Sequence, residues 1–578
     1  MATSVLTVNE EKLADLLHLF HNAQTSDDKF QAVSSLGKLG YLGLFGNDGK
    51  IKDPIYKSRV GDCGLYRRAL GDSSDNATDI QLQKTSLFRA VNEGRKNSDD
   101  NAIESESKRQ NKPLEIYRSP IEATSDLFKI PPYRMDKITE DEIRAKVHCK
   151  IFVDGAYGVF QRHETLIIYN DMDGISDFAS TICGIGLSGK SNSPALFGEF
   201  SRGFLAMLNH CDSILISSIS KQRVYFTILR QCPYSEASLL FPRISKDKCW
   251  WDYIVMEDGG VPSIPLSMFN EKLPDGSKIE EGTTITYFGV KNIPGGATLL
   301  FNVLNFATPF ACLPAEATDM RYRDRPARLT GAGTTGYNEQ NGDVEKMLED
   351  RGHVRGHELP VIIKVFNTKK DAPTPEKRLD LTWKKGVVFF TRHGHTYYTL
   401  DVVQACEIVP KLQFIQNYFN VFVNMDNLDT DFVRSIWKPT RELDEANEKT
   451  RDLRETAMRV VEKNSELERI IQEKLQREVG GDELDQFVEE LTEFDEGDLL
   501  PDDAVGKGKI VRQPGPEIKP DGSTAFVERK KHILAPGTEM KREPQNDLPP
   551  DWNTRLPALY HRRKKNVSVP ADFKDTKP

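Results

Sequence analysis

Glycine and small polar residues concentrate between positions 184 and 203, and they are the residues of this chain best suited to hold an anion. Two clusters share this composition, GIGLSGKS at 184–191 and GEFSRG at 198–203. Apolar residues at 204–208 predict a helix that begins beside the second cluster. Glycines this dense at a helix start leave backbone N–H groups free to turn toward a negative charge. The segment therefore predicts a site for a phosphate-bearing ligand.

The first cluster also fits the P-loop pattern G-x-x-x-x-G-K-[ST], in which Lys190 and Ser191 would hold phosphates and Mg²⁺. A P-loop needs a buried strand before its first glycine and a helix that begins at the lysine. The preceding residues, SDFASTIC at 176–183, are mixed and polar, and Pro194 breaks a helix soon after Ser191. A P-loop NTPase that uses residues 184–191 remains the alternative.

Phosphoryl transfer also needs a group that orients the attacking water and a hard oxygen that helps to hold Mg²⁺. Residues 85–100, TSLFRAVNEGRKNSDD, contain both types of group. Glu93 and Asn97 are four residues apart, so they share one face of a predicted helix for which Ser86 is a candidate N-cap. An ordinary charged surface helix is the competing interpretation.

Two further segments would position these groups. The apolar run at 166–169 predicts a short buried strand, and the polar turn NDMDG at 170–174 follows it directly. In this turn Gly174 would let the backbone approach a ligand closely. Residues 281–287, EGTTITY, predict another strand, which begins with the glycine-threonine pair at 282–283.

In this order, the helix, the turn, the glycine-rich loop and the glycine-threonine pair resemble the motifs of the Bergerat-fold (GHKL) ATPases, nearest to the MutL, MORC and topoisomerase II group. The resemblance implies an α/β fold: an α+β two-layer sandwich that binds ATP and Mg²⁺, then a transducer-like α/β domain, a long helix and disordered tails. It further implies an ATP-dependent homodimer that acts as a clamp in DNA maintenance or defence. Met172 and Ser201 depart from the pattern, because the family has glycine at both places. A chaperone-like ATPase that acts on proteins, and a nucleotide-binding protein without hydrolysis, remain alternatives.

The resemblance also assigns the catalytic groups. Glu93 would be the general base for ATP hydrolysis, and Asn97 would be the Mg²⁺ ligand. In relatives, one basic residue of the second domain reaches the γ-phosphate, and Lys438 and Arg441 are the candidates here.

The remaining motif residues are expected to bind the nucleotide. Asn170, or Asp171 if the register shifts by one residue, would contact the adenine together with Gly174 and Thr283. The glycine-rich loop would act as a lid over the phosphates through Gly186, Ser188, Lys190, Gly198, Phe200, Ser201 and Gly203.

Shifts in composition predict the domain boundaries. These are an N-terminal helical segment at 1–59, the ATP-binding domain at 60–312 with an insertion at about 104–145, the second α/β domain at 313–437, a long helix or coiled coil at 438–479, and an acidic then basic tail at 480–578.

The composition also limits the partners and the compartment. A formal net charge of −9 gives no overall attraction to nucleic acid, so a DNA client would have to be bound by local patches such as RRKK at 562–565. The eight cysteines show no C-x-x-C pair, and the N-terminus shows no signal peptide, so we expect a cytoplasmic protein without a membrane span. His393 and His395 are expected to be exposed strand histidines rather than metal ligands.

Overall fold

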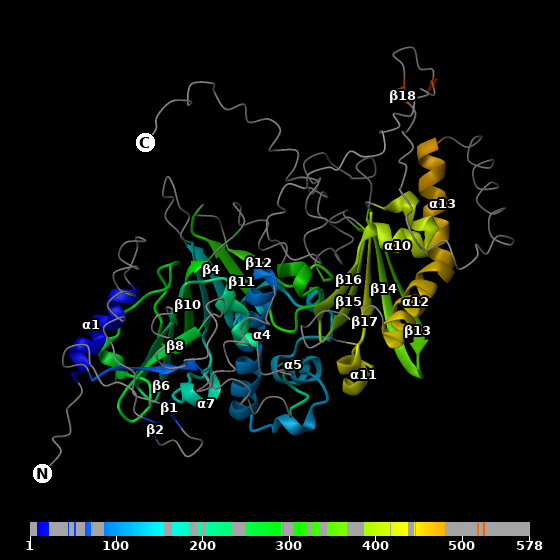
Figure 1. Ribbon diagram of the computed structural model, residues 1–578. Coiled ribbons are helices and arrows are strands. Elements are labelled where there is room, and N and C mark those ends of the chain that lie inside the picture. The colour runs from blue at the N-terminus through cyan, green and yellow to red at the C-terminus, as the bar shows by residue number, and fades with distance from the viewer. Residues whose placement is uncertain are drawn as a thin grey trace, which may run out of the picture. The chain divides into compact units, whose positions relative to one another are not determined.

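The computed structural model describes residues 9–21, 44–45, 51–53, 64–70, 86–154, 164–183, 193–197, 203–232, 250–290, 293, 304–321, 326–334, 344–366, 386–416, 418–436, 444, 447–479, 517–518 and 524–525. The chain divides into two compact units, Met1–Ser465 with Asp551–Pro578, and Glu466–Pro550. The first unit contains both large sheets (Figure 1).

As far as the chain is described, the larger sheet has ten strands, in the order β12-β11-β4-β5-β10-β6-β7-β8-β3, with β9 paired to β7. The strands are β3 Tyr66–Ala69, β4 Cys149–Asp154, β5 Glu164–Asn170, β6 Ser213–Ser220, β7 Arg223–Cys232, β8 Trp250–Val255, β9 Ser263–Pro265, β10 Gly282–Val290, β11 Ala315–Asp319 and β12 Ala327–Leu329. Only β11 and β4 pair in parallel among them; the other pairs are antiparallel.

Helices cover both faces of this sheet. Successive side chains of a strand point to opposite sides, so each face carries its own set of apolar residues, which a helix covers. Helix α4, Leu87–Arg109, packs through Ala90 and Val91 on one face. Helix α1, Glu10–His21, packs through Leu13 and Leu17 on the other. The α/β sandwich expected from the sequence is thereby confirmed.

Short helices follow α4 where the sequence predicts an insertion. They are η3 Leu114–Ile116, α5 Pro120–Phe128, η4 Met135–Lys137 and α6 Glu140–Ala145. Their starts carry local caps: Ser119 accepts from the backbone of Glu122, and Thr139 forms a capping box with Glu142. These helices enclose a separate apolar cluster that includes Ile103 of α4.

The second sheet has the strand order β13-β14-β17-β15-β16. Its strands are β13 Val344–Val354, β14 His357–Phe366, β15 Val387–Arg392, β16 His395–Leu400 and β17 Phe419–Asn424. Strands β15 and β17 run in parallel, and helix α10, Val402–Ile408, and η11, Pro410–Ile415, lie between them in the chain. Since β11 and β12 belong to the first sheet, the two sheets separate in the chain after Leu329, later than the boundary expected at 312.

The expected long helix at 438–479 consists of α12, Glu448–Lys463, and α13, Ser465–Val479. Asn464 ends α12, and its side chain donates to Asp350 of β13. Helix α12 lies directly on β13, where a Cβ on Gly352 would be 2.8 Å from Val460.

The remaining described elements are short. They are β1 Leu44–Phe45, β2 Ile51–Asp53, α7 Phe178–Thr181, η6 Gly203–Asn209, η7 Leu266–Met268, α11 Thr430–Ser435, β18 Glu517–Ile518 and β19 Thr524–Ala525. None of the helices within the described ranges combines the length and the apolar character needed to cross a membrane.

The prediction that His393 and His395 are exposed was wrong. They flank the turn between β15 and β16, and only 7% and 1% of their surfaces are exposed. The turn is buried because it abuts Phe310: the backbone N–H of Phe310 donates to the carbonyl of Gly394. Burial, and then the nearby charge of Arg392, lowers the pKa of His393 to about 3.

Replacement of His393 by Asn should make the stability of the chain less sensitive to acid. The folded-state pKa of His393 lies below its unfolded value of about 6.5, so stability is lost as the pH falls below that value, by about 1.4 kcal/mol per unit. Asn tolerates the positive φ of 50° at this position and does not titrate. Between pH 7.5 and 5.5, the free energy of unfolding of the parent should fall by about 1.4 kcal/mol more than that of the variant.

Urea unfolding at the two pH values measures this difference. Asp426, whose pKa is raised to about 7 by burial, changes stability in the opposite direction, but it is present in both chains. Arg355→Asn is the matched control, because Arg355 also has a positive φ, of 48°, in the turn between β13 and β14. An equal pH dependence of parent and His393→Asn would contradict the assignment.

Candidate functional site

Helix α4 carries the first group of candidate residues, and it lies unusually close to the sheet. Ser86 caps the helix by accepting from the backbone N–H of Arg89, as the sequence predicts. Gly94 lowers the intrinsic helix propensity, but a Cβ at this position would be 2.5 Å from Cδ1 of Ile168 on β5, so a larger residue would require that side chain to move. The close approach brings the C-terminal half of α4 to the end of β5.

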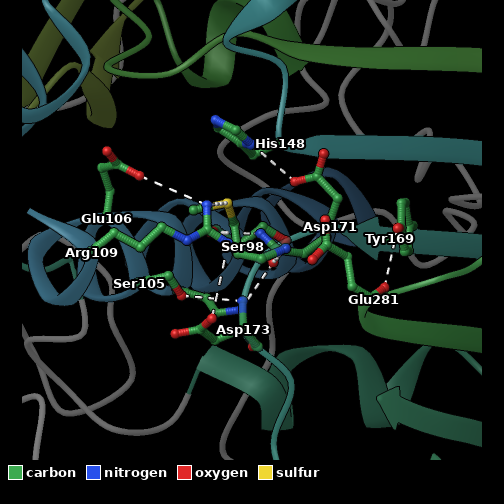
Figure 2. Close-up of polar contacts among 12 residues, drawn as sticks. Ser98, Ser105, Glu106, Arg109, His148, Tyr169, Asp171, Asp173 and Glu281 are labelled. Carbon is green, nitrogen blue, oxygen red and sulfur yellow. Dashed lines mark hydrogen bonds and ion pairs between the residues drawn. The ribbon is translucent and has the colours of Figure 1, made fainter. Parts of the chain in front are cut away.

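The Asn170 side chain joins α4 to the turn that follows β5. Its Nδ2 donates to the carbonyl of Ser98 at 2.9 Å, and its Oδ1 accepts from the backbone N–H of Met172 at 3.0 Å. These partners fix which end of the amide is oxygen, because a carbonyl only accepts and a backbone N–H only donates. Figure 2 shows Ser98 at the centre of these contacts. Asn170 is 4% exposed, so its amide acts mainly as a structural link.

Asn101 is part of the same link, and the sequence argument missed it. Its Nδ2 donates to Asn170 Oδ1 at 2.9 Å and to the carbonyl of Asp173 at 3.0 Å. A signal was present in the sequence, since Asn101 follows Asn97 by four residues and lies on the same face of the helix. Within the described part of the chain, neither Asn97 nor Asn101 has a hydrogen bond to its amide oxygen.

Glu93 lies two turns further toward the start of α4, about 12 Å along the helix axis from Asn101. Its carboxylate pairs with Lys96 at 3.1 Å, and both side chains are largely buried. The Lys96 ammonium also lies 5.2 Å from the ring centroid of Tyr397 on β16. Glu93 is therefore on the part of α4 that faces the second sheet, and not beside the turn.

Thr283 lies level with Asn170, because the two residues are directly paired across β10 and β5. Its hydroxyl is 2.7 Å from that of Ser218 on β6, which also accepts from the backbone N–H of Ile175. Gly174 fits between these groups, since a Cβ there would be 1.8 Å from the carbonyl oxygen of Ile219. The glycine is needed for close contact between the turn and β6.

Asp171 points to the other side of Asn170. Its carboxylate lies 2.9 Å from Nδ1 of His148, which precedes β4, whereas Thr283 is on β10. Figure 2 shows the Asp171–His148 contact, and it shows Asp173 in contact with Ser105 and Arg109 of α4. The Asp171 carboxylate therefore lies toward β4, and Thr283 lies on β10, the other neighbour of β5.

Met172, the departure from glycine in the turn, is only 1% exposed. It belongs to the apolar cluster of the insertion, where it is grouped with Ile103, Leu196 and Phe197. Its side chain is therefore accommodated by the inserted helices.

Residues 193–197 are the described part of the predicted phosphate loop. The backbone N–H of Phe197 donates to Asp100 Oδ1 of α4 at 2.7 Å. Gly203 begins η6, which packs on α4. The other predicted residues of the loop and of the second domain lie outside the described residues: Gly186, Ser188, Lys190, Gly198, Phe200, Ser201, Lys438 and Arg441.

The groups around this junction suit an uncharged or anionic ligand with hydrogen-bonding edges. They include neutral amides and hydroxyls, while the two acids of the turn, Asp171 and Asp173, face His148 and Arg109. Burial raises the pKa of Asp99, an acid on α4, to about 7, with the opposing charge of Arg95 as the second influence. Among the described residues, no group of three or more His, Cys, Asp or Glu side chains is arranged to bind a metal.

Comparisons with known proteins identify no family for the chain. No protein-family model matches it, and no curated protein matches it. One similar solved structure is the 43K ATPase domain of Thermus thermophilus gyrase B in complex with an aminocoumarin, with 12% sequence identity, covering 68% of this chain and 99% of that one. The TM-score is 0.27, so this similarity carries no argument about function.

Asn170→Asp should destabilise the chain, although aspartate has nearly the same shape. A carboxylate cannot donate to the Ser98 carbonyl, so a buried hydrogen bond is replaced by repulsion that costs about 1–3 kcal/mol. Protonation would restore the donor, so the folded-state pKa of the new carboxyl should be raised and the stability should fall as the pH rises. Urea unfolding at pH 5 and pH 8 should show a larger loss at pH 8.

Asn427→Asp is the matched control, because the exposed Asn427 also donates to a backbone carbonyl, that of Glu358. This variant should remain within about 0.5 kcal/mol of the parent. Equal, small effects at both positions would show that Asn170 does not hold α4 to the turn.

Proposed function

We propose that this chain binds ATP with Mg²⁺ at the junction of α4, the turn after β5, the start of β10 and residues 193–197, and that it hydrolyses the nucleotide. The main support is the convergence of these segments. Asn101 and Asp100 of α4 contact the turn and Phe197, respectively, and Asn170 is paired with Thr283. Three segments that resemble Bergerat-fold motifs in sequence, together with residues 193–197 between the two glycine-rich clusters, thus lie close to one another.

The amide oxygens on α4 suit the phosphate end of the ligand. Asn97 and Asn101 are one helical turn apart, and an amide oxygen is the hard type of ligand that Mg²⁺ accepts. When bound, Mg²⁺ would neutralise charge on the phosphates. Asn97 is the better candidate to hold it, because Asn101 is already engaged with Asn170 and Asp173.

The adenine base of the nucleotide would lie against the turn and the start of β10. Asn170 can offer only its one remaining N–H, because its oxygen accepts twice. The hydroxyl of Thr283 and the close backbone at Gly174 complete this surface. Asp171 is the weaker candidate for the adenine contact, because His148 holds it on the β4 side.

Glu93 would act as the general base, with Lys96 holding its carboxylate in place. Lys438 or Arg441 would then approach the γ-phosphate from the second domain. A homodimeric clamp that acts on DNA is the fuller form of this proposal, and the basic cluster at 562–565 favours DNA over a protein client.

Glu93→Gln should separate binding from hydrolysis. The amide keeps the size of the side chain but cannot take a proton, so Mg²⁺-ATP affinity should stay within about threefold while turnover falls roughly 10²- to 10⁴-fold. Isothermal titration and phosphate release measure the two quantities. Light scattering of the ATP-loaded variant would show a dimer if the clamp proposal is right.

Glu466→Gln serves as the control, because Glu466 also forms an i,i+3 pair with a cation, Arg469, on another helix. It should hydrolyse ATP like the parent. If Glu93→Gln also hydrolysed ATP at the parental rate, Glu93 would be only a structural partner of Lys96. If the parent did not bind ATP, the proposed function would be refuted.

Two further substitutions distinguish this site from the P-loop alternative. Asn97→Ala should weaken Mg²⁺-dependent nucleotide binding at least tenfold, because it removes the free amide oxygen on α4. Lys190→Ala should retain measurable binding if the backbone of the loop holds the phosphates. If Asn97→Ala bound the nucleotide with parental affinity and Lys190→Ala did not bind it, the same titration would favour the P-loop.

A further inference from the structure

Phe197 contacts two elements that are far apart in the sequence. Its backbone N–H donates to Asp100 of α4 at 2.7 Å. Its ring meets the imidazole of His395, the first residue of β16, edge to face, with 4.8 Å between centroids and 84° between planes. Phe197 is 8% exposed and His395 1%. One buried residue of the predicted phosphate loop therefore bridges α4 and the second sheet.

His395 is itself held in a fixed orientation. Thr308 donates its hydroxyl hydrogen to Asn92 Oδ1 of α4 at 2.7 Å. Nδ1 of His395 lies 3.0 Å from the Thr308 oxygen and 3.3 Å from Nδ2 of Asn92, so both side chains hold the ring in place. Burial is the largest cause that lowers the pKa of His395 well below its ordinary value, so the ring is neutral at pH 7. A neutral, oriented ring can support Phe197 without introducing a buried charge.

We propose that His395 and Phe197 are positioning residues of the nucleotide site: the second sheet holds residues 193–197 against α4, beside the asparagines that would bind Mg²⁺-ATP. The inference rests on the proposed function, because it assigns a role within the same site. Asp100, the partner of Phe197 on α4, is the residue before Asn101 and three residues after Asn97. A shift of Phe197 would therefore be transmitted to the helix segment that carries both free amide oxygens.

The structure also offers a comparison that separates positioning from simple packing. Phe310 and Phe422 form another edge-to-face pair, with 5.1 Å between centroids and 74° between planes. This pair joins β17 of the second sheet to the segment that precedes β11 of the first sheet, and residues 193–197 are not part of its cluster. Loss of either pair should cost stability, whereas only loss of the Phe197–His395 pair should weaken nucleotide binding.

The experiment compares Phe197→Leu, His395→Gln, the double variant and Phe422→Leu in the full-length chain. Mg²⁺-ATP affinity is measured by titration. The rise in Tm at saturating nucleotide is measured against each variant's own nucleotide-free Tm, so that an overall loss of stability cancels. We expect affinity to fall by about 5- to 150-fold in both single variants. The double variant should bind no more weakly than the weaker single variant, because both remove the same contact.

Phe422→Leu should have a lower nucleotide-free Tm but parental affinity. Parental affinity in Phe197→Leu and His395→Gln, with a loss of Tm like that of Phe422→Leu, would show that the pair only packs the two sheets together. If the parent itself bound no ATP, the proposed function would fall first and this inference with it.

Discussion

The close contact between α4 and β5 is the constraint on which the rest of the site depends. Gly94 leaves room for the Ile168 side chain, and one turn further along the helix the Asn170 amide donates to the carbonyl of Ser98. The contact places charged residues of α4 in the interior, which is costly unless they find partners. Arg95, fully buried, donates through Nη2 to the backbone carbonyls of Leu313, which precedes β11, and of Leu329 in β12. The helix is thus fixed to the sheet from both of its flanks.

The sequence was sufficient to predict what depends on local pattern and burial. The apolar runs that became β5, β6 and β10 are central strands, and their side chains are buried on both faces, which makes them easy to recognise. Strand β13 was not predicted, because VEKMLEDRGHV is mostly polar and lies at an edge of the second sheet. Its single covered face is defined by α12, which comes about a hundred residues later. Contacts of that kind cannot be read from a local window.

Helix α4 also shows that a local sequence pattern cannot identify which residues make a distant contact. Glu93, Asn97 and Asn101 repeat every four residues, so spacing alone predicts that all three share a face. Only packing determines which of them reaches the turn, and it selects Asn101, because the helix meets the end of β5 near Ser98. The buried histidines at the β15–β16 turn were mispredicted for a related reason. A polar residue on a strand is usually exposed, but here the turn is covered by a segment distant in sequence.

Two residues of the turn after β5, Asn170 and Met172, are explained by the elements packed against the turn. A methionine can replace glycine at position 172 because the inserted helices supply an apolar cluster for its side chain. Asparagine suits position 170 better than aspartate because α4 presents a carbonyl, which requires a donor. The acids of this region are also held by partners: Glu93 faces Lys96, Asp173 faces Arg109, and Asp100 accepts from the backbone N–H of Phe197. Packing by the inserted helices thus accounts for Met172, and the Ser98 carbonyl accounts for Asn170.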